Sequence, residues 1–407
     1  MSTIKSSTTT TTAYSVEADT TGALVIQTGV TPTTALTVGS DQSVTFAGAV
    51  SLSGNQTTTG NLTVNGNTTL GDASTDTILM TGAPSIGGAG LGMGMGFRNR
   101  LINGGMGIAQ RGTSFTSGAN NDDAYVLDRF YILSDGNDAI DVTQTTTVPT
   151  GAKYSIGLDV ETTNKKFGIA QIIENANCFD AIGGNVTLSF QAKVSSTTKL
   201  DNVKCAIVAW SGTADTVTSD IISAWGAEGT NPTLIANATY ENTPANLNVT
   251  TSFATYSVTA NVDTASTANI IVFIWSDVTD TTAGDFLYIT NVQLEKGSTA
   301  TSFDYRDYST ELMLAQRYYV GLNFYWFTSG YDANYTTLNR GGLSWSYQMR
   351  ITPSMSITAG GMDGHHAIPP SASVIDYYGV SLQFTGLAYR PNVSTSANVS
   401  FTLSAEL

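Results

Sequence analysis

The chain is poor in charge, and poorest in basic residues. Only 12% of its 407 residues are charged, against roughly 25% in an average protein. Lys and Arg number 17 and Asp and Glu number 32, which gives a net charge of −15. Nucleic-acid binding needs clustered Lys and Arg to neutralise phosphates. The composition therefore argues against nucleic acid as a partner.

Long hydrophobic runs are missing as well. The longest, Ile270–Trp275, has six residues, whereas a membrane-spanning helix needs about 20. The N-terminal stretch Met1–Thr8 has no apolar core of the kind a signal peptide requires. We therefore expect a chain that is made in a cytoplasm, is not exported by that route and does not insert into a membrane.

Cysteine and histidine are nearly absent. Two cysteines, Cys178 and Cys205, are too few for a disulfide framework. We expect two free, buried thiols on different strands. The two histidines, His365 and His366, are adjacent and would point to opposite faces of a strand, so they make a poor metal pair. Neither has the Gly-x-Ser-x-Gly context that often accompanies a catalytic triad.

Acidic pairs need separate weighing, because glycoside hydrolysis uses two carboxylates that face each other across a sugar. The pairs close in sequence are Asp122 with Asp123, Asp135 with Asp138, and Asp277 with Asp280. All lie in turn-like stretches rich in Ser, Gly and Asn, where Asp is expected to hydrogen-bond to its local backbone. We predict that the protein is not an enzyme.

Thr, Ser, Asn and Gly are abundant in place of charged residues, and this composition favours strands and tight turns. Short runs of Val, Ile, Phe and Tyr recur between turn residues, and no long helical period appears. The sequence predicts an all-β protein.

Residues 1–80 contain short alternating runs and an 18-residue repeat. Val44-Thr-Phe46 followed by Gly48 matches Leu62-Thr-Val64 followed by Gly66. One such unit cannot bury its narrow apolar face alone, so it needs either a single-chain solenoid or several identical chains wrapped together. Because the repeats are few, we favour an intertwined shaft in a homotrimer. Residues 81–96 form a glycine-rich neck.

Residues 97–306 have the strand content of one jelly-roll β-sandwich. The expected strands are Val126–Leu133, Tyr154–Val160, Gly168–Ile173, Val186–Ala192, Cys205–Trp210, Phe253–Val258, Ile270–Trp275 and Phe286–Leu294. Residues 307–407 are expected to form one short helix, Glu311–Tyr319 with Thr310 as its N-cap, and then a C-terminal β-sandwich-like domain at the distal tip.

Three segments carry a family resemblance. They are Leu101–Thr113 followed by Tyr125–Tyr131, then Val186–Lys193, and then the junction Tyr288–Tyr319. Together they resemble the jelly-roll module of phage tail fibres, which is itself similar to carbohydrate-binding modules. The match spans residues 97–320. The stretch Ala18–Thr28 also resembles the start of fibre or appendage proteins of marine bacterial viruses.

The resemblance implies a structural protein of a bacteriophage virion, and a tail fibre by default. Residues 1–40 would bind other virion proteins, and the distal β-domains would recognise a bacterial surface glycan. A head fibre or a capsid-decorating structural appendage is the alternative. A glycan-depolymerising tailspike is less favoured, because such enzymes usually present a long parallel β-helix and the shaft here is short.

Carbohydrate-binding modules of this kind often hold a structural calcium near the final strand. Here Thr290 and Asn291 stand where an acidic pair is typical, so we expect no cofactor. The weak calcium candidates are Asp135, Asp138, Asp277, Asp280 and Asp285.

Sugars bind by stacking a C–H face on an aromatic ring. The glycan-binding candidates are aromatic residues in polar or turn-rich stretches. They are Tyr331 and Tyr335, the pair Tyr377 and Tyr378, and Trp225, which we expect to be exposed within Ser223–Glu228.

Overall fold

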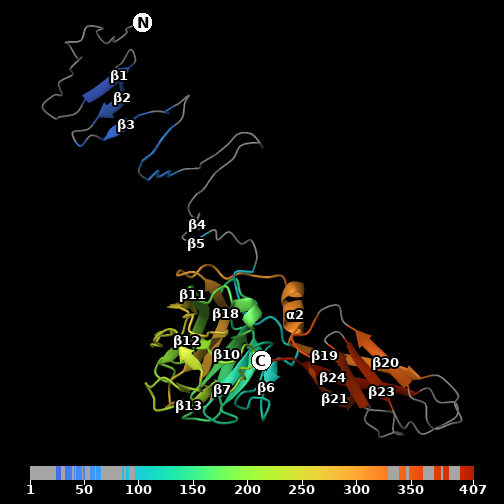
Figure 1. The fold of residues 1–407 in the computed structure, drawn as a ribbon. Helices are drawn as coiled ribbons and strands as arrows, with labels where there is room; N and C mark the ends of the chain where they lie inside the picture. Colours follow the sequence, from blue (N-terminus) through green and yellow to red (C-terminus); the bar gives the residue numbers. More distant parts are fainter. Residues whose placement is uncertain are drawn as a thin grey trace. The chain divides into compact units, whose positions relative to one another are not determined.

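The structure is a computed structural model. It describes residues 97–328 continuously, and on either side 24–28, 33–38, 41, 43–47, 49–50, 56–59, 61–65, 85–86, 89–90, 339–344, 348–360, 371–376, 379–384 and 395–407. The chain divides into two compact units, Met1–Leu79 and Met80–Leu407. The regular elements of the described residues are antiparallel strands, apart from two helices (Figure 1). They contain no helix long and apolar enough to cross a membrane.

The first unit contains one small antiparallel sheet of three strands, β1 (Leu24–Thr28), β2 (Thr33–Val38) and β3 (Val44–Phe46). These strands fall on three of the short alternating runs that the sequence shows in residues 1–80, at Ala23–Gln27, Ala35–Val38 and Ser43–Phe46. The second copy of the repeat differs, because residues 61–65 form no strand.

Both copies of the repeat leave their apolar side chains in solvent. Val44 and Phe46 are each 54% exposed, and the matching Leu62 and Val64 are 72% and 48% exposed. Within this unit, therefore, no described residue buries the apolar face of the repeat.

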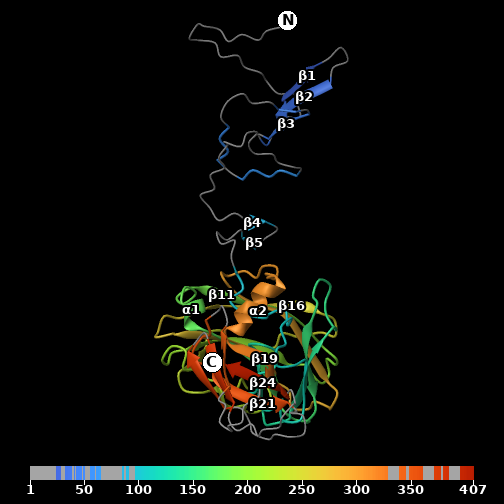
Figure 2. The ribbon, with the colours of Figure 1, turned by 90° about the vertical axis from the view of Figure 1, so that its right-hand side faces the viewer.

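The second unit begins with a two-residue hairpin, β4 (Ser85–Ile86) and β5 (Ala89–Gly90). It continues as two facing sheets of a jelly-roll sandwich (Figures 1 and 2). The five-stranded sheet has the order β15-β12-β17-β10-β7, and its strands are β7 (Tyr131–Ser134), β10 (Phe167–Ile173), β12 (Val203–Trp210), β15 (Ala238–Tyr240) and β17 (Asn269–Ser276). The six-stranded sheet has the order β16-β11-β18-β9-β8-β6, and its strands are β6 (Ser114–Phe115), β8 (Ile140–Thr145), β9 (Ser155–Val160), β11 (Asn185–Val194), β16 (Ala254–Asn261) and β18 (Phe286–Lys296).

The main core lies between the two sheets. On β11, Val186, Leu188 and Phe190 point into it, and the intervening Thr187 and Ser189 lie on the outer face. Central strand β17 is buried along its whole length, so both of its faces must be covered. The predicted jelly-roll sandwich is confirmed.

A second apolar cluster covers the outer face of the five-stranded sheet. Phe273 and Trp275 of β17 stack there, with ring centroids 4.4 Å apart. Residues 211–237, including the short strands β13 (Ile222–Ala224) and β14 (Thr233–Leu234), fold over this face and bury Val217 and Ile221 against it. Leu407 joins the same cluster. This face is therefore closed to solvent.

Two helices occur among the described residues. Helix α2 (Tyr308–Gln316) corresponds to the one short helix that the sequence predicted at Glu311–Tyr319. It starts three residues earlier than expected, because Asp307 rather than Thr310 is the N-cap, and its carboxylate accepts from the Ser309 and Thr310 amides. The short helix α1 (Asn175–Cys178) holds Cys178, so this cysteine is not on a strand. Both cysteines are free and buried, as predicted.

The chain after α2 returns to strands, as predicted. One sheet has the order β19-β24-β21, with β19 (Tyr319–Thr328), β21 (Ser354–Gly360) and β24 (Thr395–Ser404). The other has the order β20-β23-β22, with β20 (Asn339–Ser344), β22 (Ser371–Asp376) and β23 (Gly379–Phe384). The residues after β24 dock on the sandwich, because Glu406 forms ion pairs with Arg129 and, at 2.9 Å, with Arg111.

Candidate functional site

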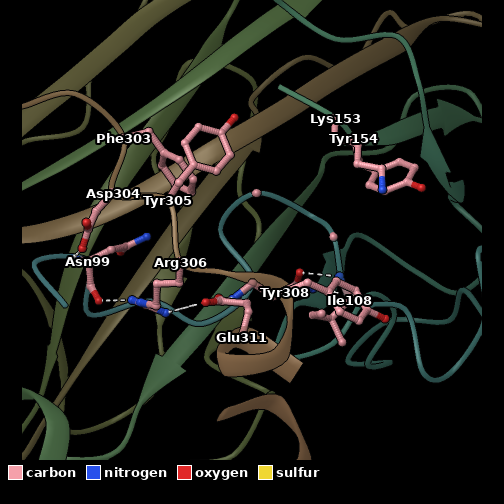
Figure 3. Close-up of a pocket in the computed structure, with 13 residues that line it drawn as sticks. Asn99, Ile108, Lys153, Tyr154, Phe303, Asp304, Tyr305, Arg306, Tyr308 and Glu311 are labelled. Atoms are coloured by element: carbon pink, nitrogen blue, oxygen red, sulfur yellow. Dashed lines mark hydrogen bonds and ion pairs between the residues drawn. The ribbon is translucent and has the colours of Figure 1, made fainter. Parts of the chain in front are cut away.

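A pocket of about 180 Å³ lies on the sandwich unit, within the junction between the last sandwich strand and α2 (Figure 3). It is bounded by the loop 99–108, by residues 153–154 just before β9, and by the segment 303–311. Four aromatic side chains line it: Tyr154, Phe303, Tyr305 and Tyr308. The pocket thus combines four aromatic side chains with charged and amide side chains.

The segment that carries three of these rings is fixed to the sandwich by hydrogen bonds. The Asp304 amide donates to Gln293 Oε1 at 2.8 Å, and Asp304 Oδ2 accepts from the Arg98 amide at 2.8 Å. The Tyr305 hydroxyl donates to the Gly151 carbonyl at 2.6 Å. Because backbone and side chain are both held, Tyr305 keeps its place although it is 57% exposed.

The loop on the other side of the pocket is fixed by Asn103. This residue has a φ of +63°, which Asn tolerates better than most residues. Its side chain donates to the Ile108 carbonyl at 2.9 Å and accepts from the Ile108 amide at 2.8 Å, so it closes the loop into a ring. A Cβ at Gly104 would lie 2.0 Å from the Val292 carbonyl oxygen, so only glycine lets the loop approach β18 this closely.

The charges around the pocket balance. Arg306 pairs with Glu311 at 2.9 Å and donates to the Leu101 carbonyl at 3.0 Å and to the Asn99 carbonyl. Its side chain is only 6% exposed, so Arg306 is a buried link between α2 and the loop 99–108. Glu311 also accepts from the Asn103 amide, which ties the first turn of α2 to the loop. Lys153 is exposed, with Nζ 5.2 Å from the Tyr154 ring centroid.

This arrangement suits a polar ligand with an apolar face. Aromatic rings offer stacking surfaces, and Lys153, Tyr308 and Tyr154 carry hydrogen-bonding groups that make no side-chain hydrogen bond to another described residue. In the part of the chain that the structure describes, no three His, Cys, Asp or Glu side chains are grouped to hold a metal ion.

Four of the predicted glycan-binding residues lie outside the described residues: Tyr331, Tyr335, Tyr377 and Tyr378. The fifth, Trp225, was expected to be exposed, and that expectation is wrong. Trp225 is only 9% exposed and packs edge-on against Phe273, with ring centroids 6.0 Å apart. The reason is the apolar outer face of β17, which needs a cover and receives it from the 211–237 segment.

The calcium candidate Asp277 is also placed differently from the prediction. It is fully buried, and its two carboxylate oxygens pair with Lys166 and, at 2.6 Å, with Lys204. Two ammonium groups therefore satisfy this carboxylate, and it does not lie in an exposed turn.

The other four calcium candidates are engaged separately. Asp280 pairs with Lys199 at 3.2 Å, and Asp135 lies 4.0 Å from Lys165. Asp138 accepts from Asn120, and Asp285 accepts from the Thr282 amide. These contacts do not bring the candidates together around one point.

Sequence reasoning missed the pocket residues. The spacing of Phe303, Tyr305 and Tyr308 in the junction was the signal that could have found them. The spacing does not reveal that Tyr154, which is distant in the sequence, lines the same pocket.

No protein-family model and no curated protein sequence matches the chain. Solved structures do. The enzymatically active domain of tailspike protein 4 of bacteriophage CBA120 is 16% identical, with a TM-score of 0.29 over 49% of this chain. The match spans 22% of the tailspike chain, so this protein corresponds to about a fifth of its length.

Carbohydrate-binding modules are similar to the chain as well. A family 4 module is 13% identical, with a TM-score of 0.26 over 48% of this chain and 98% of the module. The CBM22-1 xylan-binding domain of Paenibacillus barcinonensis Xyn10C is 11% identical, with a TM-score of 0.24 over 42% of this chain and 87% of that domain.

Proposed function

We propose that this protein is a structural protein of a bacteriophage virion, a trimeric tail fibre that binds a bacterial surface glycan at the pocket beside α2. The observation that carries the glycan assignment is the set of four aromatic side chains around a small, charge-balanced pocket. The resemblance of the segments Leu101–Thr113, Val186–Lys193 and Tyr288–Tyr319 to tail-fibre modules supports the placement in a virion.

The chemistry of the pocket supports a sugar over other small ligands. A sugar ring offers a C–H face that stacks on an aromatic ring, and hydroxyl groups at its rim. Tyr305 and Tyr308 expose 57% and 64% of their surface, so their rings are accessible. Lys153 and the hydroxyls of Tyr154 and Tyr308 line the pocket and could hydrogen-bond to the hydroxyl groups of a sugar.

The proposal is tested on a printed array of bacterial surface polysaccharides. We expect the intact protein to bind at least one polysaccharide, and Tyr305→Ala and Tyr308→Ala each to weaken that binding about tenfold, which corresponds to about 1.4 kcal/mol. Phe179→Ala is the matched control, because Phe179 is also 64% exposed but does not line the pocket.

Two results would contradict the glycan assignment. One is an intact, folded protein that binds no polysaccharide on the array. The other is full binding by both tyrosine variants. Imaging of labelled protein on the virion separates a tail fibre from the alternatives, since a position on the head would favour a head fibre or a capsid decoration.

A further inference from the structure

We propose that the protein forms an internal covalent cross-link, an amide bond between Lys204 Nζ and Asn231 Cγ, with Asp277 as the proton acceptor. This modification site is independent of the glycan pocket. It joins β12 of the five-stranded sheet to the segment 211–237, which folds over the outer face of that sheet.

Three buried side chains meet at one end of the five-stranded sheet. Lys204 of β12 is paired in register with Trp275 of β17, and Asp277 follows β17 directly. Lys166 directly precedes β10, the other neighbour of β17. The side chains of Lys166, Lys204 and Asp277 are between 0% and 5% exposed. The strand register therefore gathers two amines and one carboxylate in a site that is closed to solvent.

Lys204 and Asn231 are in direct contact. Lys204 Nζ donates to Asn231 Oδ1 at 2.9 Å, and this oxygen is bonded to Cγ, the carbon that the amine would attack. The Tyr240 hydroxyl donates to the Pro232 carbonyl at 2.8 Å, which holds the chain in place beside Asn231. A nucleophile and an electrophile that are held together in this way react much faster than the same groups free in solution.

Asp277 is placed to activate the amine. Its Oδ2 lies 2.6 Å from Lys204 Nζ, which is within reach of a proton transfer. A lysine becomes nucleophilic when it is desolvated or lies beside another cation. Lys204 meets both conditions, because it is buried and because Lys166 pairs with the other oxygen of the same carboxylate.

The reaction needs no further reactant. Asp277 takes a proton from the Lys204 ammonium group, and the free amine attacks Asn231 Cγ. The new C–N bond forms and the bond from Cγ to Nδ2 breaks. The departing nitrogen takes one proton from the attacking nitrogen and one from Asp277, and it leaves as an ammonium ion. Asp277 is again a carboxylate at the end.

The buried charge of the site favours the product. Before the reaction, two lysine ammonium groups share the single carboxylate of Asp277, and neither forms an ion pair with another described Asp or Glu. One positive charge is therefore left over, and a buried charge without a partner is costly. The ammonium ion carries this charge away, and Lys166 and Asp277 remain as a balanced pair.

Two features favour Asn231 as the electrophile. A bond from either lysine to Asp277 would release water and would leave the second ammonium group without a counter-charge. In addition, Pro232 follows Asn231 and has no backbone N–H. The common competing loss of ammonia, in which the next backbone nitrogen attacks the Asn side chain, is therefore blocked at this position.

Mass spectrometry of the intact, denatured protein tests the proposal. We expect a mass below that of the sequence by one ammonia molecule. Digestion with trypsin and a glutamate-specific protease should cut after Glu228 and Glu241 but not after Lys204. It should therefore give residues 200–228 joined to residues 229–241. The joined peptide locates the bond, which the intact mass alone does not.

Two variants remove the reacting groups. Asn231→Ala removes the electrophile and Asp277→Ala removes the proton acceptor, so both should show no loss of ammonia and should be cut after Lys204. Asn231→Ala should also melt roughly 5–10 °C lower than the parent protein, because the cross-link closes the loop 204–231. Asn246→Ala is the matched control. Asn246 also hydrogen-bonds to the chain beside β12, at the Asp201 carbonyl, and its loss should leave the bond in place.

A parent protein of full mass that is cut after Lys204 overturns the proposal. Loss of water, with a peptide that joins Lys204 or Lys166 to Asp277, overturns it as well. A cross-link that persists in Asp277→Ala overturns the role of Asp277. If this variant does not fold, the joined peptide of the parent protein and its absence from Asn231→Ala decide the question.

Discussion

At the scale of single residues, two buried lysines bind the loop 225–231 to the five-stranded sheet. Lys166 Nζ donates to the Ala227 carbonyl at 2.7 Å, and Lys204 Nζ donates to Asn231 Oδ1 at 2.9 Å. Both lysines pair with Asp277 beneath. Because a buried charge is costly unless it is paired and hydrogen-bonded, the three groups hold the 225–231 loop against the sheet. The same contacts explain why Trp225 is buried.

A half-buried acid, Asp123, gives rise to a pH prediction. Burial, and then the charges of Asp122 and Asp220, raise the pKa of Asp123 to about 7. Between about pH 4 and pH 7 the folded state then binds more protons than the unfolded state, so stability falls as pH rises through that window. Asp123→Asn should flatten this slope and raise the melting temperature above pH 7. Asn also tolerates the φ of +65°.

Thermal unfolding at a series of pH values measures this effect. Asp135→Asn is the control, since Asp135 is 47% exposed and its removal should leave the slope in place. If the melting temperature of Asp123→Asn depended on pH as steeply as that of the parent protein, Asp123 would not be the source of the pH dependence.

At the scale of elements, the start of α2 positions the pocket. Asp307 caps the helix, and the first turn then supplies Tyr308 and Glu311. Asp307→Ala should lower the melting temperature and weaken polysaccharide binding together, and Asp307→Asn should restore both, because Asn also caps helices well. Hydrogen bonds from Thr310 and Ser309 lower the pKa of Asp307, so the cap's contribution is present above the usual pKa of 3.8 and lost on acidification.

Calorimetry and array binding on the same samples measure both effects. Unchanged affinity in a destabilised Asp307→Ala would show that the pocket does not depend on the cap.

At the scale of the whole molecule, the exposed apolar residues of the N-terminal unit lead us to predict that the chain forms an oligomer. Phe46 and Leu62, with their neighbours in the two repeats, expose apolar surface that no described residue of the same unit covers. Burial of such surface is the main driving force of association. Light scattering at micromolar concentration should therefore give three times the chain mass of 42.7 kDa. Phe46→Ser combined with Leu62→Ser should shift the mass toward that of one chain.

A stable monomer of the intact protein would refute the trimer. The matched control is Phe179→Ser, because Phe179 lies in the second unit and its exposure of 64% falls between those of Phe46 and Leu62.

The sequence by itself determined the fold class, the two free buried cysteines and the presence of one short helix after residue 306. Alternation, turn residues and helix-capping residues are local signals, and they survive tertiary packing. The sequence could not determine that the N-cap is Asp307 rather than Thr310. Both residue types cap helices, and which one does so depends on the path of the chain before the helix.

Only the tertiary structure decided which aromatic residues face solvent. Trp225 is buried because a distant apolar strand needs a cover, and Tyr154 joins Tyr305 because β9 and the segment after β18 meet at one edge of the sandwich. Such contacts depend on the sheet order, which brings together residues that are far apart in the chain. The candidate site is made of these contacts, and so the sequence alone could not show it.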